Sequence, residues 1–222
     1  MHIYDKDFIH GELPMTKQEV RAVSIAKLQL EDDSVLIDVG AGTGTIGIEA
    51  ATYIKNGKVI GIEKEEKGLE VIRENVKKFN LDNYFLIHGR APENIPEINY
   101  DRMFIGGSTG GMREIVAHFM QYSKKNSRLV INAITLETLS SSMEILKEFG
   151  FKDIEVVNLM VGRAVSVLLW NVRKENLQER SDRMISVLQH RISRKMLLPE
   201  ESAFAPFLER AISMKWKQLL VF

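Results

Sequence analysis

The stretch Asp38-Val39-Gly40-Ala41-Gly42-Thr43-Gly44 decides how this chain of 222 residues folds. It completes the apolar run Val35–Val39, which has the length and composition of a buried strand, and it precedes a helical segment at 46–54. Glycines at such a turn let the backbone bend tightly and let a ligand approach it closely, and the following helix presents free N–H groups. The stretch therefore predicts a ligand-binding turn between a strand and a helix.

Strands and helices continue to alternate beyond this turn. The first helix is expected to begin at Thr16, because Thr16 and Glu19 form the pattern of a capping box. Further strands are expected at 59–62, 84–87, 102–105, 129–133, 154–159 and 165–170, and further helices at 65–79, 112–122 and 136–149. Such alternation predicts an α/β, Rossmann-like fold with a mostly parallel, seven-stranded sheet covered on both faces by helices. The last two strands have a short link, so they must pair antiparallel or lie apart.

The pattern changes after residue 170. One apolar stripe steps by four from Met184 to Met196, and a second runs from Phe204 to Ile212. We therefore expect a domain over residues 1–172 and a helical C-terminal extension over 173–222. Because two short helices bury little surface alone, a neighbouring subunit is the partner we favour for the stripes.

Composition excludes several classes of function. The chain has no cysteine, which rules out disulfides, thiolate nucleophiles and zinc–thiolate sites. The formal net charge is zero, and the +4 carried by residues 171–222 is better explained by a solvated helical face than by a nucleic-acid site. Neither a signal peptide nor an apolar stretch of the ~20 residues that span a bilayer is visible. We expect a cytoplasmic protein that binds neither nucleic acid nor membrane.

Two acidic residues indicate which ligand the turn binds. The segment Gly42-x-Gly44-x-x-Gly47 also matches the dinucleotide pattern, which is weak evidence alone. Asp38 would repel a pyrophosphate at this turn, whereas the cationic S-adenosylmethionine would be attracted. Glu63, at the end of the next strand, suits the two hydroxyls of a ribose and fits either NAD or S-adenosylmethionine. A glycine-rich turn with solvated acids is the purely structural alternative, and S-adenosylmethionine is the cofactor we expect.

Five segments, in this order, resemble one narrower family. They are Pro14-Met15-Thr16-Lys17-Gln18-Glu19-Val20-Arg21, Asp38 to Gly44, Gly89-Arg90-Ala91-Pro92-Glu93, Phe104-Ile105-Gly106-Gly107 and Asn132-Ala133-Ile134-Thr135-Leu136-Glu137. Over residues 8–170 the chain resembles the decarboxylating class I methyltransferases of cobalamin biosynthesis that act on cobalt-precorrin-6B. The resemblance implies transfer of a methyl group from S-adenosylmethionine to C-15 of a corrin precursor, loss of the C-12 acetate carboxyl as carbon dioxide, and a homotetramer. It says nothing about the residues beyond 171.

The motifs and the resemblance together give the candidate site. The cofactor is expected to contact Asp38, Gly40, Gly42, Gly44, Thr45, Glu63, Gly89, Arg90, Ala91 and Gly106. The substrate, a flat macrocycle with many carboxylate arms, is expected to contact Thr16, Lys17, Arg21, Gly107, Asn132 and Thr135, and Arg113 is a further loop-borne cation. Solvated surface charges remain the alternative for these cations, and a helix N-cap is the alternative for Thr135. Arg90 stands where many class I enzymes carry an adenine-binding acid, so a substrate carboxylate is its preferred partner.

No catalytic acid or base is named. His118 lies within a helical pattern and is assigned to the structure, and His88 ends a strand without further support. The sulfonium is already activated, so positioning supplies most of the rate of methyl transfer. No metal ligand is expected. Two other functions remain open, an RNA (tRNA) methyltransferase that binds RNA through the C-terminal helices, and a non-enzymatic binding protein, against which the intact cofactor motif argues.

Overall fold

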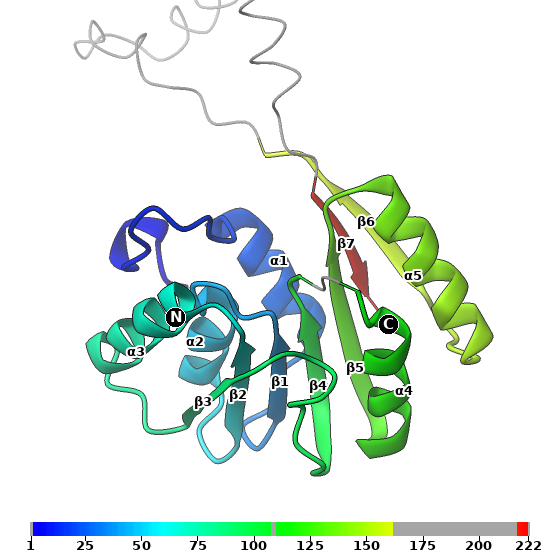
Figure 1. Ribbon diagram of the computed structural model, residues 1–222, viewed down its shortest axis with the longest axis horizontal. Coiled ribbons are helices and arrows are strands. Elements are labelled where there is room, and N and C mark those ends of the chain that lie inside the picture. The colour runs from blue at the N-terminus through cyan, green and yellow to red at the C-terminus, as the bar shows by residue number, and fades with distance from the viewer. Residues whose placement is uncertain (1, 108–109, 162–216, 222) are drawn as a thin grey trace, which may run out of the picture. The chain divides into compact units, whose positions relative to one another are not determined.

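The computed structural model describes residues 2–107, 110–161 and 217–221, in which strands and helices alternate along the chain (Figure 1). The strands are β1 (Val35–Val39), β2 (Lys58–Glu63), β3 (Tyr84–His88), β4 (Tyr100–Ile105), β5 (Ser123–Ala133), β6 (Glu155–Leu159) and β7 (Lys217–Val221). The helices are the short 3-10 helix η1 (Asp5–Asp7), α1 (Gln18–Leu28), α2 (Thr45–Tyr53), α3 (Glu66–Lys78), α4 (Met112–Tyr122) and α5 (Leu136–Glu148). None of the helices described is long and apolar enough to cross a membrane.

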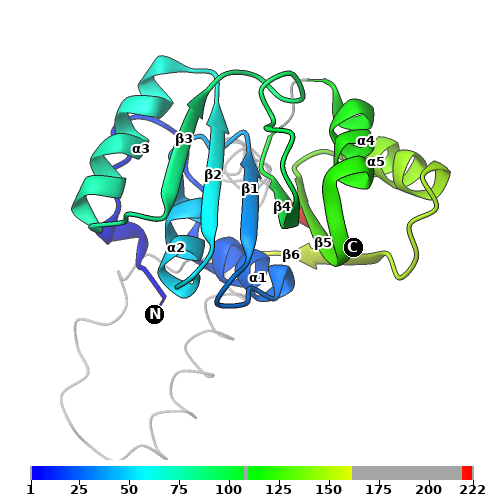
Figure 2. The ribbon, with the colours of Figure 1, turned by 90° about the horizontal axis from the view of Figure 1, so that it is seen from below.

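The strands form one sheet in the order β3-β2-β1-β4-β5-β7-β6 (Figure 1), and Figure 2 shows the strands from β3 to β5 in the same order. The five strands from β3 to β5 are parallel, whereas β7 pairs antiparallel with both β5 and β6. The chain moves outward from β1 to β3 and then crosses to β4 on the other side of β1. Open parallel sheets bind ligands outside the carboxyl ends of the strands at such a reversal. The expected Rossmann-like parallel sheet with its helices is confirmed.

The pleat of the strands divides the core into two layers. Leu36, Val59 and Phe104 belong to a cluster that includes residues of α1, α2 and α3. Ile37 and Ile60, each the neighbour of one of these residues in sequence, belong to a second cluster with residues of α4 and α5. Successive side chains of a strand point to opposite faces, so both faces of the sheet are buried under helices.

The C-terminal end of the chain differs from the prediction. Residues 217–221, which the sequence assigned to the helical extension, form β7 between β5 and β6. The strand predicted at 165–170 and both apolar stripes lie outside the described residues. The short run Leu219–Val221 was ambiguous because a few apolar residues suit a buried strand as well as a helix end. Only the partner strands, which are distant in sequence, decide between the two.

The first helix also begins differently. Lys17 is the N-cap of α1, and no side chain caps the helix, so the predicted capping box is wrong. The carbonyl of Thr16 instead accepts a hydrogen bond from Arg21 Nη1. At the other end of α1, the carbonyl of Gln29 accepts bonds from Arg102 at the start of β4. The helix therefore runs opposite to the parallel strands, and its N-terminus lies toward their carboxyl ends.

Candidate active site

A cavity of about 280 Å³ lies at the carboxyl ends of β1, β2, β3 and β4. Its walls come from the residues that end these strands or follow them, and from the first turn of α4. The lining residues are Val39, Gly40, Ile62, Glu63, Lys64, Gly89, Arg90, Ala91, Gly107, Gly110 and Ile115. The cavity therefore occupies the place where the fold predicts a ligand.

The glycine turn after β1 forms the floor of this cavity. Gly40 has φ 68°, and a Cβ there would lie 2.3 Å from the carbonyl oxygen of Gly107, so no other residue fits. The amides of Gly40 and Ala41 donate to the carbonyl of Ile62, and the amide of Gly106 donates to that of Val39. These bonds tie the turn to both neighbouring strands.

Glu63 is held rigidly at the end of β2. Its side chain is 6% exposed, and its Oε2 accepts a 2.6 Å bond from the amide of Gly42. Its Oε1 accepts from the amides of Lys64 and Glu65 at 2.8 and 2.9 Å. A carboxylate offers about four acceptor positions, so a position remains for a ligand hydroxyl. A fixed, partly unused acceptor on the cavity wall suits a ribose.

Asp38 lies beneath the turn and does not line the cavity. Its side chain is 1% exposed, and its Oδ2 accepts from the amide of Gly47 at 3.1 Å in the first turn of α2. Burial raises the pKa of Asp38 to about 7, although the bond from Gly47 lowers it; the negative charge of Glu63 adds to the rise. The carboxyl can thus act on a ligand through its charge.

The other predicted cofactor residues divide into two groups. Gly89, Arg90 and Ala91 line the cavity. Gly42, Gly44, Thr45 and Gly106 do not; they shape the turn and its surroundings. Gly44, for example, has φ 74°, and a Cβ there would lie 2.9 Å from the side chain of Ile72.

The loop after β3 presents Arg90 to the cavity. The amide of Gly89 donates to the carbonyl of Glu63, and a Cβ on Gly89 would lie 2.3 Å from Asn94. Asn94 Oδ1 in turn accepts from the amide of Arg90 at 2.9 Å. Arg90 is exposed, so its cation can meet a solvated anionic ligand.

The predicted substrate residues are dispersed. Gly107 lines the cavity, whereas Thr16 and exposed Lys17 lie at the N-terminus of α1. Asn132 is 7% exposed near the end of β5, and its Oδ1 has no hydrogen-bond partner in the part of the chain described. Thr135 is the N-cap of α5 and accepts from the amide of Thr138, as the alternative interpretation stated.

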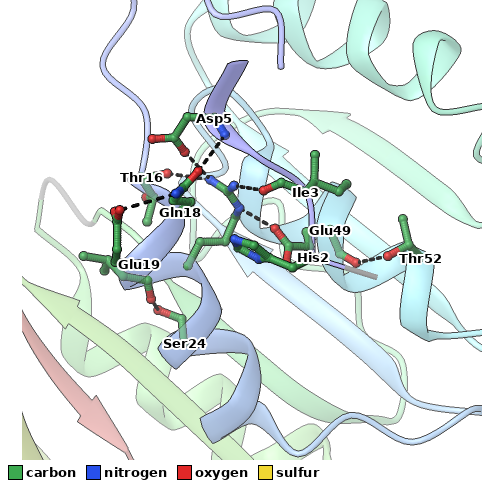
Figure 3. A network of polar contacts seen from close by, with 11 residues as sticks. His2, Ile3, Asp5, Thr16, Gln18, Glu19, Ser24, Glu49 and Thr52 are labelled. Atoms are coloured by element: carbon green, nitrogen blue, oxygen red, sulfur yellow. Dashed lines mark hydrogen bonds and ion pairs between the residues drawn. The ribbon is translucent and has the colours of Figure 1, made fainter. Parts of the chain in front are cut away.

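Arg21 is not available to a substrate, and this prediction is wrong. Its side chain is 0% exposed, and its guanidinium donates to Glu49 Oε2, Asp5 Oδ1 and the carbonyls of Thr16 and Ile3. Figure 3 shows Ile3, Asp5 and Glu49 in this network of polar contacts. Arg21 is buried because α1 turns this cation toward α2 and away from solvent.

Three further residues have structural partners. Arg113 forms a bidentate pair with Glu148, and this bond lowers the pKa of Glu148. The Nδ1 atom of His118 contacts the hydroxyl of Tyr100 at 3.1 Å, which agrees with its structural assignment. The Nε2 atom of the exposed His88 lies 3.2 Å from the carbonyl oxygen of Lys64. None of these contacts indicates a catalytic base.

A larger cavity, of about 410 Å³, lies between α3 and β3. Its walls include Ile72, Val76 and Leu81, and it reaches the start of β3 at Tyr84. It lies away from the carboxyl ends of the strands, where parallel sheets bind their ligands. Its size alone does not make it the candidate active site.

Sequence reasoning missed several residues of the cavity wall. Val39, Ile62 and Lys64 flank residues that were predicted, so their positions in the motifs could have included them. Ile115 comes from the buried face of α4, and nothing in the sequence links that face to the glycine turn. Tyr84, whose ring packs under the turn against Gly47 and Gly61, was likewise missed.

Comparison with known proteins agrees with this site. The model of the family described as the precorrin methyltransferase domain matches residues 6–172. A protein of Saccharolobus solfataricus named probable cobalt-precorrin-6B C(15)-methyltransferase (decarboxylating) is 38% identical over 168 residues, which are 74% of this chain and 83% of that protein.

Two solved structures of precorrin enzymes are also similar to this chain. The precorrin-6y C5,15-methyltransferase of Geobacter metallireducens has a TM-score of 0.67 and 38% identity, over 72% of this chain and 85% of that one. The precorrin 8w decarboxylase of Methanobacterium thermoautotrophicum has a TM-score of 0.66 and 32% identity, over 74% of this chain and 90% of that one. The glycine turn, the acid at the end of β2 and these matches lead to one conclusion: the chain belongs to the precorrin methyltransferase family, whose methyl donor is S-adenosylmethionine.

Proposed function

We propose that this enzyme methylates C-15 of cobalt-precorrin-6B or precorrin-6B and removes the C-12 acetate carboxyl as carbon dioxide. The observation that carries the proposal is the cavity in which Gly40, Glu63 and Arg90 meet, in a chain 38% identical to a relative named for this reaction. The glycine and the carboxylate suit a cationic nucleoside, and the arginine suits an acidic substrate.

The cofactor's residues can be assigned from the geometry. Gly40 lets the ligand approach the backbone, and Glu63 offers its remaining acceptor position to the ribose. The bound cofactor would supply a methyl group already activated on a sulfonium. The protein then has to hold the donor and C-15 in line, which is worth several orders of magnitude in rate.

Arg90 and Lys17 are the candidate substrate contacts. Arg90 lines the cavity, and Lys17 lies on the exposed N-terminus of α1 at the same edge of the sheet. We propose that each binds a carboxylate arm of the macrocycle, and that Asn132 lies close to the bound substrate at the end of β5. When the C-12 carboxylate leaves as carbon dioxide, its electron pair enters the conjugated macrocycle and a proton replaces it. The ring system itself accepts the electrons, so this step needs no metal or dedicated base from the protein.

A homotetramer and a cytoplasmic location remain predictions from the resemblance and the sequence. The RNA methyltransferase alternative depended on the helices after residue 172, which lie outside the described residues. No observation in the described part of the chain favours it.

Mass spectrometry of products from the purified enzyme, S-adenosylmethionine and cobalt-precorrin-6B tests the proposal. The expected product has gained one methyl group and lost carbon dioxide. A product that is methylated but still carries every carboxyl group would restrict the function to methyl transfer. An unchanged macrocycle, together with methylation of tRNA in a parallel reaction that contains tRNA in place of the macrocycle, would support the RNA alternative.

A further inference from the structure

Two buried polar side chains lie close to each other beneath the glycine turn. Asp38 at the end of β1 is 1% exposed, and Tyr84 at the start of β3 is 7% exposed. Asp38 Oδ1 and the Tyr84 hydroxyl both lack a hydrogen-bond partner among the described residues. Buried polar groups in this state cost free energy, so their presence under a ligand-binding turn suggests a role in the site.

Two glycines allow Tyr84 to lie against Asp38. A Cβ on Gly47 would lie 2.7 Å from both Asp38 Oδ2 and Tyr84 Cε2. A Cβ on Gly61 would lie 2.1 Å from the Tyr84 hydroxyl oxygen, and Gly61 is the register partner of Asp38 on β2. The phenol therefore crosses β2 and ends beside the carboxyl group, in space that any side chain at 47 or 61 would fill.

The surroundings of Asp38 have opposite effects on its pKa. From α2, the amide of Gly47 donates to the carboxyl, which favours the charged form. From β2, the charge of Glu63 opposes it, and burial opposes it most, so the pKa of Asp38 lies at about 7. From β3, burial holds the pKa of Tyr84 well above its usual value of 10.0, so its hydroxyl stays a neutral donor. The neighbour from β4, Phe104, is apolar.

We propose that Asp38, with Tyr84 beside it, determines the preference of the site for the sulfonium donor over the demethylated thioether product. This inference rests on the proposed function. S-adenosylmethionine carries one positive charge more than S-adenosylhomocysteine, and methyl transfer removes that charge. An ionised Asp38 under the turn attracts the donor more strongly than the product, and a neutral Asp38 does not distinguish them by charge.

Binding of the donor is linked to the ionisation of Asp38, so the preference for the donor depends on pH. Donor binding favours the ionised carboxyl and so lowers the pKa of Asp38 in the complex. Above the free pKa of about 7 the group is already ionised and the preference for the donor is complete. As pH falls below that value, donor binding must expel a proton, and the preference weakens.

Calorimetric titration of the full chain with each of the two ligands at pH 6, 7 and 8 tests the inference. The ratio of the Kd of S-adenosylhomocysteine to that of S-adenosylmethionine should fall by about fivefold from pH 8 to pH 6, given a free pKa near 7 and a lower one in the complex. The pKa of the amino group differs between the two ligands because only the donor carries the sulfonium charge, so the same titrations of Asp38→Asn measure the part of the ratio that comes from the ligands.

Variants separate this role from a structural one. Asp38→Asn should leave only the pH dependence that comes from the ligands, and Tyr84→Phe should move the midpoint of the ratio to higher pH because the buried carboxyl then has a wholly apolar ring beside it. Tyr100→Phe is the matched control, since Tyr100 is also fully buried and contacts His118 on the other face of the sheet; its profile should equal that of the original protein.

A ratio independent of pH in the original protein, or a Tyr84→Phe profile identical to it, overturns the inference while the proposed function stands. Failure of the folded original protein to bind either ligand overturns both.

Discussion

Glu63 illustrates how one side chain can shape a site and also bind in it. Its two oxygens accept three backbone bonds, from Gly42, Lys64 and Glu65. These bonds join the glycine turn to the end of β2 before any ligand arrives. A carboxylate fixed in this way loses little entropy on binding, which is the advantage of a preorganised site.

Replacing Glu63 by Gln should weaken binding of S-adenosylhomocysteine by roughly 1–3 kcal/mol, because a ribose hydroxyl loses a charged acceptor. Calorimetry at pH 8 measures the effect. Glu65→Gln, which changes the adjacent and largely exposed carboxylate, is the control and should bind normally. Equal affinities for the two variants would remove Glu63 from the ribose site.

Arg90 should affect the substrate and not the cofactor. Arg90→Ala is expected to raise the KM for the corrin precursor by about tenfold or more, the value of one charge-assisted hydrogen bond, with little change in cofactor affinity. Arg113→Ala is a suitable control, because Arg113 already pairs with Glu148. Loss of cofactor affinity in a folded Arg90→Ala variant would instead assign Arg90 to the adenine.

The sequence revealed the glycines and acids of the site more reliably than its cations. Gly40 and Glu63 were predictable because a strand–turn–helix pattern places them at a known edge of the sheet. Arg21 and Lys17 belong to one motif, yet α1 buries the first and exposes the second. The packing of α1 on α2 decides which cation is available to a ligand. That packing depends on residues far apart in the sequence, so the motif around Arg21 does not reveal it.

At the scale of elements, Arg21 joins three segments that are separate in sequence. It lies in α1, it donates to Glu49 of α2, and it holds the N-terminal segment through Asp5 and the carbonyl of Ile3. Its guanidinium also lies 4.8 Å from the centre of the Phe8 ring. One buried cation thus fixes the first residues of the chain against two helices.

Arg21→Met should destabilise the protein by about 3–5 kcal/mol, because Glu49, which is 1% exposed, stays buried and loses the guanidinium that pairs with it. Urea unfolding provides the measurement, and Arg73→Met, which breaks an exposed pair with Glu66, should change little. The double variant Arg21→Met/Glu49→Met should be more stable than the sum of the single losses. Strict additivity would mean that the two charges do not interact.

Elements were predictable where their pattern was long and local. The five parallel strands and helices α2 to α5 follow from runs of apolar residues between clear breaks. The length of β5 was underestimated, since its first half, Ser123 to Arg128, is largely polar and partly exposed. The strand β7 could not be recognised because its partners, β5 and β6, lie more than 50 residues away.

At the scale of the whole molecule, the position of β7 changes how the C-terminal region must be tested. Removal of everything after residue 172 would delete β7 together with the extension, and the buried edge of β5 from Val130 to Ala133 would lose its partner. Such a truncation should unfold at lower urea concentration, so it cannot isolate the role of the extension.

The register of β6 and β7 offers a sharper experiment. Leu159 and Lys217 are paired across the two antiparallel strands, so a two-residue turn can join them directly. A variant in which Asn-Gly replaces residues 160–216 closes this hairpin with a favoured turn and keeps all seven strands. We expect it to unfold cooperatively and to bind S-adenosylhomocysteine with unchanged affinity, because the described residues that line the cavity all lie outside the deleted segment.

Light scattering then tests whether that segment forms a subunit interface, as its apolar stripes predict. If the apolar stripes from Met184 to Met196 and from Phe204 to Ile212 bury against a neighbouring subunit, the hairpin variant should form a smaller or weaker oligomer than the full chain, since several large apolar side chains at about 1.5–3 kcal/mol each are lost from the interface. The same oligomer in both proteins, together with a raised KM for the corrin precursor in the variant, would instead make the segment a cover of the substrate site.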